Sequence, residues 1–136
     1  MNREDLLKKA EELNKALRQS EEYRAYVAAH NQIKDHSAAE IMLDDFRKKQ
    51  WDIQRRAFEG EDVEPLVEEL QKLWDVVSIN PYVKAVVESE LIFGQLYGEV
   101  MEKVAENIEV FDRSVLLILY LLSVSLAKTS IFSATF

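Results

Sequence analysis

Cysteine is absent from this chain of 136 residues, which also contains only three glycines and two prolines. Without cysteine, the chain can form neither a disulfide nor a thiolate site for zinc or an iron–sulfur cluster. This usage is compatible with the cytoplasm, where we expect the protein to be located. Few turn-forming residues, together with abundant glutamate, lysine, leucine and alanine, favour an all-α fold. The length is that of one domain with a core of its own.

Motifs of the common enzyme classes are also missing. The sequence has no P-loop, no GxGxxG and no GxSxG nucleophile turn. His30 and His36 are the only histidines, and neither follows a glutamate by three positions, so the Glu-x-x-His motif of di-iron bundles is absent. For both histidines we favour surface or capping roles. We therefore expect no enzymatic activity, no catalytic residue, no cofactor and no bound metal.

The net charge of −8 is unevenly distributed along the chain. Residues 61–113 carry four basic and thirteen acidic side chains, a balance that would repel phosphates. A basic run surrounds Trp51 in the preceding part of the chain. It consists of Lys34, Arg47, Lys48, Lys49, Arg55 and Arg56. Acidic residues interleave with this run, so we favour a solvated helix face and do not expect direct nucleic-acid binding.

Residues 37–60 have the features of one complete helix. Ser37 and Glu40 are spaced as a capping box. Gly60 is a natural C-terminal stop, because glycine adopts left-handed dihedral angles without a Cβ penalty. Between these ends, mainly apolar side chains recur at alternating spacings of four and three and predict one packing seam. The seam consists of Ala39, Leu43, Phe46, Gln50, Ile53 and Ala57.

Further helices are predicted on both sides of this segment. Residues 3–34 form either one helix or two, with Ser20 as the cap of the second. Asp62 is placed to cap the next helix, and Asn80 to cap a last one over about residues 81–109. Short connections between long helices predict an antiparallel helical-hairpin bundle of four to five helices. We expect such narrow seams to be completed in a homo-oligomer, most simply a dimer.

Polar residues and glycines interrupt the predicted seams. Gln50 and Glu90 either fix helix register and partner choice or lie at a wet helix edge; we favour the wet edge, since glutamate is seldom fully buried. Gly94 and Gly98 fit either a close helix crossing or glycine carried by drift. We expect an interaction surface to include these positions and the neighbouring seam and aromatic residues. The candidates are Phe46, Gln50, Trp51, Ile53, Phe58, Trp74, Glu90, Gly94 and Gly98.

The end of the chain differs from the rest. After Arg113 only Lys128 is charged, and the segment contains an unbroken apolar run. We divide the chain accordingly into a helical domain of residues 1–110 and an atypical tail of residues 111–136. The tail is an apolar segment packed on protein, a membrane anchor through residues 115–132, or a sequence foreign to the domain. We favour packing on protein.

Four stretches of sequence together resemble a known family. They are SEEYRAY at residues 20–26, DDFRKKQ at residues 44–50, QRRAFEGE at residues 54–61 and LQKLWDVVSINPYV at residues 70–83. In this order and spacing they resemble the YlbF/YmcA family of bacterial regulators over about residues 3–108.

This resemblance implies a small cytoplasmic all-helical protein that self-associates or joins complexes with related regulators. Such complexes influence competence, sporulation and biofilm formation, and are linked to RNA processing through an endoribonuclease. The family has no catalytic residues to transfer. The iron–sulfur binding of some members is not transferred, because this chain lacks cysteine, and the tail has no counterpart in the pattern.

We therefore predict a non-enzymatic regulatory or adaptor protein that acts through protein–protein contacts. A membrane-anchored helical module held by the tail is the alternative from another class. A direct RNA-binding module ranks third.

Overall fold

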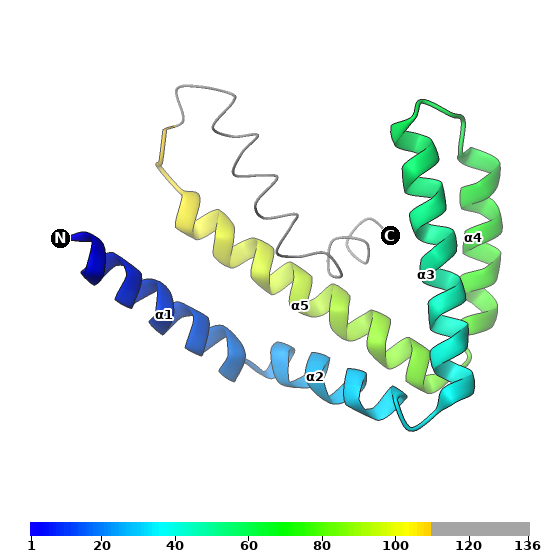
Figure 1. Cartoon of the computed structure of the whole chain (residues 1–136), viewed down its shortest axis with the longest axis horizontal. Helices are drawn as coiled ribbons and strands as arrows, with labels where there is room; N and C mark the ends of the chain where they lie inside the picture. Colours follow the sequence, from blue (N-terminus) through cyan, green and yellow to red (C-terminus); the bar gives the residue numbers. More distant parts are fainter. Residues whose placement is uncertain (110–136) are drawn as a thin grey trace.

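The computed structural model describes residues 1–109, and within that range all regular structure is α-helical, as predicted (Figure 1). The helices are α1 (Arg3–Gln19), α2 (Glu21–Ile33), α3 (Ser37–Phe58), α4 (Glu64–Val77) and α5 (Pro81–Ala105). Residues 110–136, which include the predicted tail, lie outside the described part of the chain.

The N-terminal arm consists of two helices, which settles the alternative left open by the sequence. Ser20 has extended dihedral angles and lies between α1 and α2. Its Oγ accepts a hydrogen bond from the Tyr23 backbone N–H at 3.1 Å and donates one to the Leu17 carbonyl at 2.6 Å. One hydroxyl therefore caps α2 and satisfies a carbonyl at the end of α1.

The two ends of α3 differ in how well the sequence predicts them. The predicted capping box is wrong, because Ser37 is already helical and His36 precedes it without a side-chain cap bond. The His36 ring instead stacks on Tyr82, with ring centroids 3.6 Å apart. The C-terminal stop is confirmed, since Gly60 has φ +87° and donates to the Ala57 carbonyl. Glu61 also donates its backbone N–H to the Arg56 carbonyl, which completes a Schellman motif.

The helices after Gly60 follow the predicted order with shifted ends. Asp62 is not the cap residue of α4, which begins one residue after Val63, but its carboxylate accepts the Glu64 N–H at 3.1 Å. Asn80 caps α5 as predicted, accepting the backbone N–H groups of the second and third helical residues. The helix ends at Ala105, short of the predicted end, and Asn107 beyond it has a left-handed φ of 62°.

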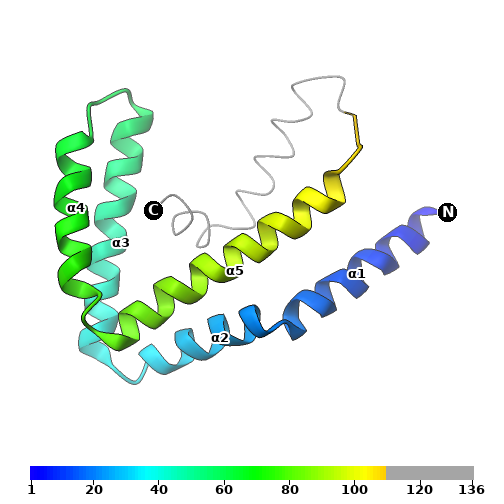
Figure 2. The ribbon, with the colours of Figure 1, turned by 180° about the vertical axis from the view of Figure 1, so that it is seen from behind.

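The helices pack as a pair and a hairpin. The most extensive helix–helix contact is between α2 and α5. The α3–α4 hairpin extends from the end of this pair at which α2 leads into α3 (Figures 1 and 2). Ten apolar residues form the core: Ala29, Ile33, Ala39, Leu43, Phe46, Ile53, Leu70, Val77, Val83 and Val86. None of them belongs to α1, which contributes no buried residue at all.

The predicted seam of α3 is confirmed over most of its length. Ala39, Leu43, Phe46, Gln50 and Ile53 are all buried. Ala57 is exposed, because it lies in the last turn of the helix near the tip of the hairpin. The hairpin thus covers most of its seam within one chain.

Candidate functional site

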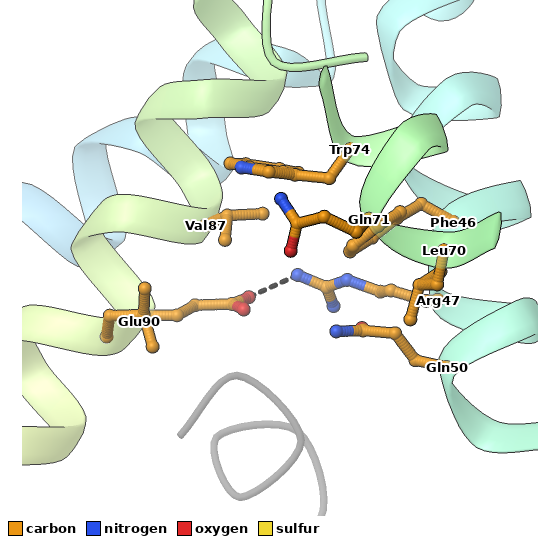
Figure 3. A pocket seen from close by; sticks show the side chains of 9 residues that line it. Phe46, Arg47, Gln50, Leu70, Gln71, Trp74, Val87 and Glu90 are labelled. Carbon is orange, nitrogen blue, oxygen red and sulfur yellow. Dashed lines mark hydrogen bonds and ion pairs between the residues drawn. The ribbon is translucent and has the colours of Figure 1, made fainter. Parts of the chain in front are cut away.

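Three charged or titratable side chains meet where α2, α3 and α5 converge. We call His30, Arg47 and Glu90 the junction cluster. Glu90 is 3% exposed, and one of its carboxylate oxygens accepts a hydrogen bond from Arg47 of α3 (Figure 3). The same oxygen lies 2.9 Å from Nε2 of His30 on α2. The favoured wet-edge interpretation of Glu90 is therefore wrong, because two partners from other helices offset the cost of burying its carboxylate.

The histidine of this cluster has an acceptor beside each ring nitrogen. Nδ1 lies 2.8 Å from the carbonyl oxygen of Tyr26, and a carbonyl can only accept, so Nδ1 carries a proton. The contact between Nε2 and the Glu90 carboxylate oxygen joins α2 to α5. A capping or purely surface role for His30, which we favoured, is wrong.

A small cavity adjoins the junction cluster between α3, α4 and α5. Its volume is about 190 Å³, and apolar side chains such as Phe46, Leu70 and Trp74 form much of its wall (Figure 3). Gln50 also lines this cavity and is 5% exposed, so the wet-edge interpretation is wrong for this residue too. The volume falls below the ~300–1,000 Å³ of ordinary ligand pockets. It suits a few waters or one side chain better than a cofactor.

A larger opening lies between α1 and the C-terminal half of α5. It measures about 1020 Å³, and we call it the α1–α5 groove. Leu13 lines it from α1, whereas Leu96, Val100 and Val104 line it from α5. The acidic residues of its α5 wall are Glu99, Glu102 and Glu106, next to one basic residue, Lys103. Apolar side chains at the centre with polar side chains around them are the general composition of protein interaction surfaces.

The α1 face toward the N-terminus is also uncovered. Leu6 is 60% exposed and Leu7 53% exposed, although both are large apolar residues of a regular helix. The ends of α1 are well formed, because Asn2 and Asp5 make a reciprocal capping box. Within residues 1–109, this regular, capped amphipathic helix therefore has an apolar face that no other helix buries.

The predicted interaction residues fall into separate places. Phe46 and Ile53 are core residues, and the Phe46 ring lies 5.4 Å from that of Trp74. Trp51 is 49% exposed and Phe58 95% exposed, and their spacing of seven puts both on one face of α3. The nine candidates therefore do not form one site.

The two glycines of α5 make no close approach to another described element. A Cβ added to Gly94 or Gly98 would meet no other heavy atom within 4 Å. Within residues 1–109, the close helix crossing considered for these glycines is not present.

The basic run divides between the interior and the surface. Arg47 turns inward to the junction cluster, which the sequence did not predict. Arg55 and Arg56 pair with Asp52 on the exposed side of α3, as expected of a solvated face. The hydrogen bond from Arg55 is the main cause that holds the pKa of Asp52 below its ordinary value, and the same bond raises the pKa of Arg55.

Sequence reasoning missed the junction cluster for a specific reason. Glu90 lies 60 positions from His30 and 43 from Arg47, so no local spacing connects them. The only signal was a charged residue inside an otherwise apolar seam. Over residues 1–109 no three histidine or acidic side chains are grouped so as to hold a metal. Nor is any helix in that range long and apolar enough to cross a bilayer.

Comparison with known proteins assigns the described helices to a family. The model of the family described as control of competence regulator ComK, YlbF/YmcA, matches residues 6–109. The chain belongs to the YlbF/YmcA family. The resemblance proposed from four short stretches of sequence is therefore confirmed.

Curated relatives of this YlbF/YmcA chain carry only an uninformative name. A UPF0342 protein of Caldicellulosiruptor bescii is 30% identical over 76% of this chain and 87% of its own length. A UPF0342 protein of Symbiobacterium thermophilum is 30% identical over 74% of this chain and 91% of its own length. A UPF0342 protein of Bacillus velezensis is also 30% identical, over 74% of this chain and 87% of its own length. No solved structure matches the chain.

Proposed function

We propose that this protein is a non-enzymatic regulatory adaptor that acts by binding other helical proteins, a second copy of itself first among them. The family description, which names control of a competence regulator, supports a regulatory role. The observation that carries the proposal is the uncovered face of α1 together with the α1–α5 groove. The proposed processes are those of the family: competence, sporulation and biofilm formation, through complexes linked to RNA processing.

A second copy fits the groove in both shape and charge. The apolar stripe of α1 can enter the groove of a neighbouring molecule, while the neighbour's α1 enters the groove of the first. Five basic residues on α1, namely Arg3, Lys8, Lys9, Lys15 and Arg18, would then lie near the acidic rim, and they outnumber the four acidic residues of the same helix, Glu4, Asp5, Glu11 and Glu12. Such reciprocal contact is a self-complementary interface, which closes as a dimer. Charges of opposite sign at its rim favour this pairing over others.

The mass of the full-length protein in solution tests this assembly. We expect light scattering to show a monomer–dimer equilibrium whose dimer fraction rises with concentration. Leu13→Glu or Val100→Glu places a charge on an apolar wall of the groove, so each variant is expected to remain monomeric with unchanged helix content. Ile79→Glu is the matched control, because Ile79 is 81% exposed and lies between α4 and α5. Dimers that survive both groove variants would contradict the proposal.

Trp51 and Phe58 offer a second contact, for a related regulator. An exposed aromatic pair beside arginine is the usual composition of a binding hot spot. We expect Trp51→Ser with Phe58→Ser to leave folding and dimer formation unchanged. In the bacterium that encodes the protein, this double variant is expected not to restore competence to a deletion strain, while Ile79→Ser restores it. Full restoration by the double variant would exclude this surface. RNA binding that the double variant abolishes would favour an RNA-binding role instead.

A further inference from the structure

We propose that residues 114–136 bind in the α1–α5 groove of their own molecule and compete there with a second copy. The competition rests on the proposed function, whereas the intramolecular binding does not. The groove is then a regulated surface: it is closed when the chain's own C-terminal segment occupies it and available to a partner when that segment leaves.

The composition of the segment matches that of the groove. Lys128 is its only charged residue, and residues 115–122 are apolar throughout. Such a segment is strongly driven to leave water. Leu13, Leu96, Val100 and Val104 provide uncovered apolar walls. Since the segment carries no acidic residue, it also adds no repulsion to the acidic rim of the groove.

The end of α5 brings the segment close to the groove. The helix stops at Ala105, and Asn107, with its φ of 62°, turns the backbone away from the helix axis (Figure 1). Val104 and Ala105 themselves line the groove, so the segment starts nine positions after Ala105 at its wall. A tether this short gives an effective concentration of about millimolar, which favours the chain's own segment over a second copy in dilute solution.

The length of the segment is also sufficient. Residues 114–136 would extend about 34 Å even in a helical conformation, against about 37 Å for the 25 residues of α5. The segment can therefore reach along most of the groove wall. A shorter extension could cover only the end near Ala105.

A photo-crosslinking experiment on the full chain tests the binding. Leu13 is replaced by benzoylphenylalanine, and ¹⁴N and ¹⁵N preparations are mixed before irradiation. We expect the crosslinked peptide to come from residues 114–136 with the same isotope as the probe. The same probe at Ile79 is the control and is expected not to label that segment. Crosslinks to a segment of the other isotope, or no crosslink to the segment at all, would overturn intramolecular binding.

A pair of charge variants tests the competition. Leu117→Glu with Leu121→Glu should release the segment and lower the dimer dissociation constant on the order of tenfold. Ser123→Glu with Thr129→Glu adds the same charge at polar positions and should leave the dimer dissociation constant unchanged. An unchanged constant in the first variant would overturn the competition.

The combined outcomes separate this inference from the proposed function. Crosslinks from Leu13 only to residues 1–109 of the other isotope would leave the proposed assembly standing and overturn the inference. Intramolecular crosslinks without dimers in any variant would do the reverse. Phosphatidylcholine vesicles provide the last arm: if the protein sediments with them and loses the intramolecular crosslink, the segment binds lipid and the inference fails.

Discussion

The α3–α4 hairpin and the two helices that border the α1–α5 groove, which we call the α1–α5 arm, have the same amphipathic pattern with opposite results. In the hairpin, the seam residues of α3 are buried against the neighbouring helices, and Phe46 and Trp74 bring their rings together. In the arm, α1 has an apolar face and a capping box that α3 and α4 lack, but it buries no residue and α5 diverges from it (Figure 2). The difference shows that an amphipathic pattern predicts an apolar helix face but does not specify what packs against it. A short turn brings α3 and α4 together, whereas within residues 1–109 no helix covers the apolar face of α1.

The largest expected effect contrasts one leucine from each region. Leu70 is 2% exposed in the hairpin, and Leu70→Ala should lower the free energy of unfolding by about 2–5 kcal/mol. Leu7 is 53% exposed, and Leu7→Ala should change the free energy of unfolding by less than about 0.5 kcal/mol under monomeric conditions. Urea denaturation measures both. Equal losses in the two variants would mean that α1 is packed as tightly as the hairpin.

A comparable loss is expected at the point where the two regions join. Arg47→Met leaves Glu90 buried without its arginine, which should cost about 3 kcal/mol. The double variant Arg47→Met with Glu90→Met removes the uncompensated carboxylate and should recover much of that loss. A double-mutant cycle in urea measures the coupling. Independent, additive effects would show that the pair does not hold α3 against α5.

Hydrogen exchange compares the two regions in the variant Leu117→Glu with Leu121→Glu, which is expected to release the C-terminal segment. Amides of α1 in this variant should exchange many-fold faster than those of α3 in dilute protein, because a solitary helix of this length is marginal in water. As concentration rises, protection should increase in α1 and stay constant in α3. In the unsubstituted protein the segment should protect α1 at every dilution, and fast exchange of α1 there would contradict its binding in the groove.

The smallest expected effect concerns the exposed face of the hairpin. Because the pKa of Asp52 is lowered in the folded protein, mainly by the hydrogen bond from Arg55, its ionised form favours folding. That contribution is complete above the ordinary value of 3.8 and is lost as pH falls through the lower folded value. Solvent exposure keeps it small. The urea midpoint of the unsubstituted protein should fall between neutral and acid pH. In the Asp52→Asn variant this fall should be only slightly smaller.

Several elements of the fold were predictable because their causes are local. Gly60 and Asn80 form their turns with backbone groups only a few residues away, so the sequence indicates them. Ser20 acts just as locally, but its sequence neighbourhood fitted one helix as well as two. The predicted capping box at Ser37 is wrong, since His36 and not Ser37 is the N-cap residue of α3. His36 also stacks on Tyr82, a contact with a distant part of the chain. Propensity carries no information about such a distant ring.

The candidate site was predicted less well than the fold. Trp51 and Phe58 are exposed, as a contact surface requires, but Phe46 and Ile53 are part of the core. Both kinds of residue look alike in sequence, since apolar side chains serve cores and interfaces equally. Only the packing of α4 and α5 against α3 distinguishes them.

The sequence by itself determined that the chain is helical and in which order its helices follow, and the order of four short stretches indicated its family. The helices depend on hydrogen bonds and side-chain periodicity within a few turns. Tertiary structure alone decided that Glu90 is buried between Arg47 and His30, and that α1 is left uncovered while α3 is not. Those outcomes depend on contacts between residues tens of positions apart, which local spacing does not specify.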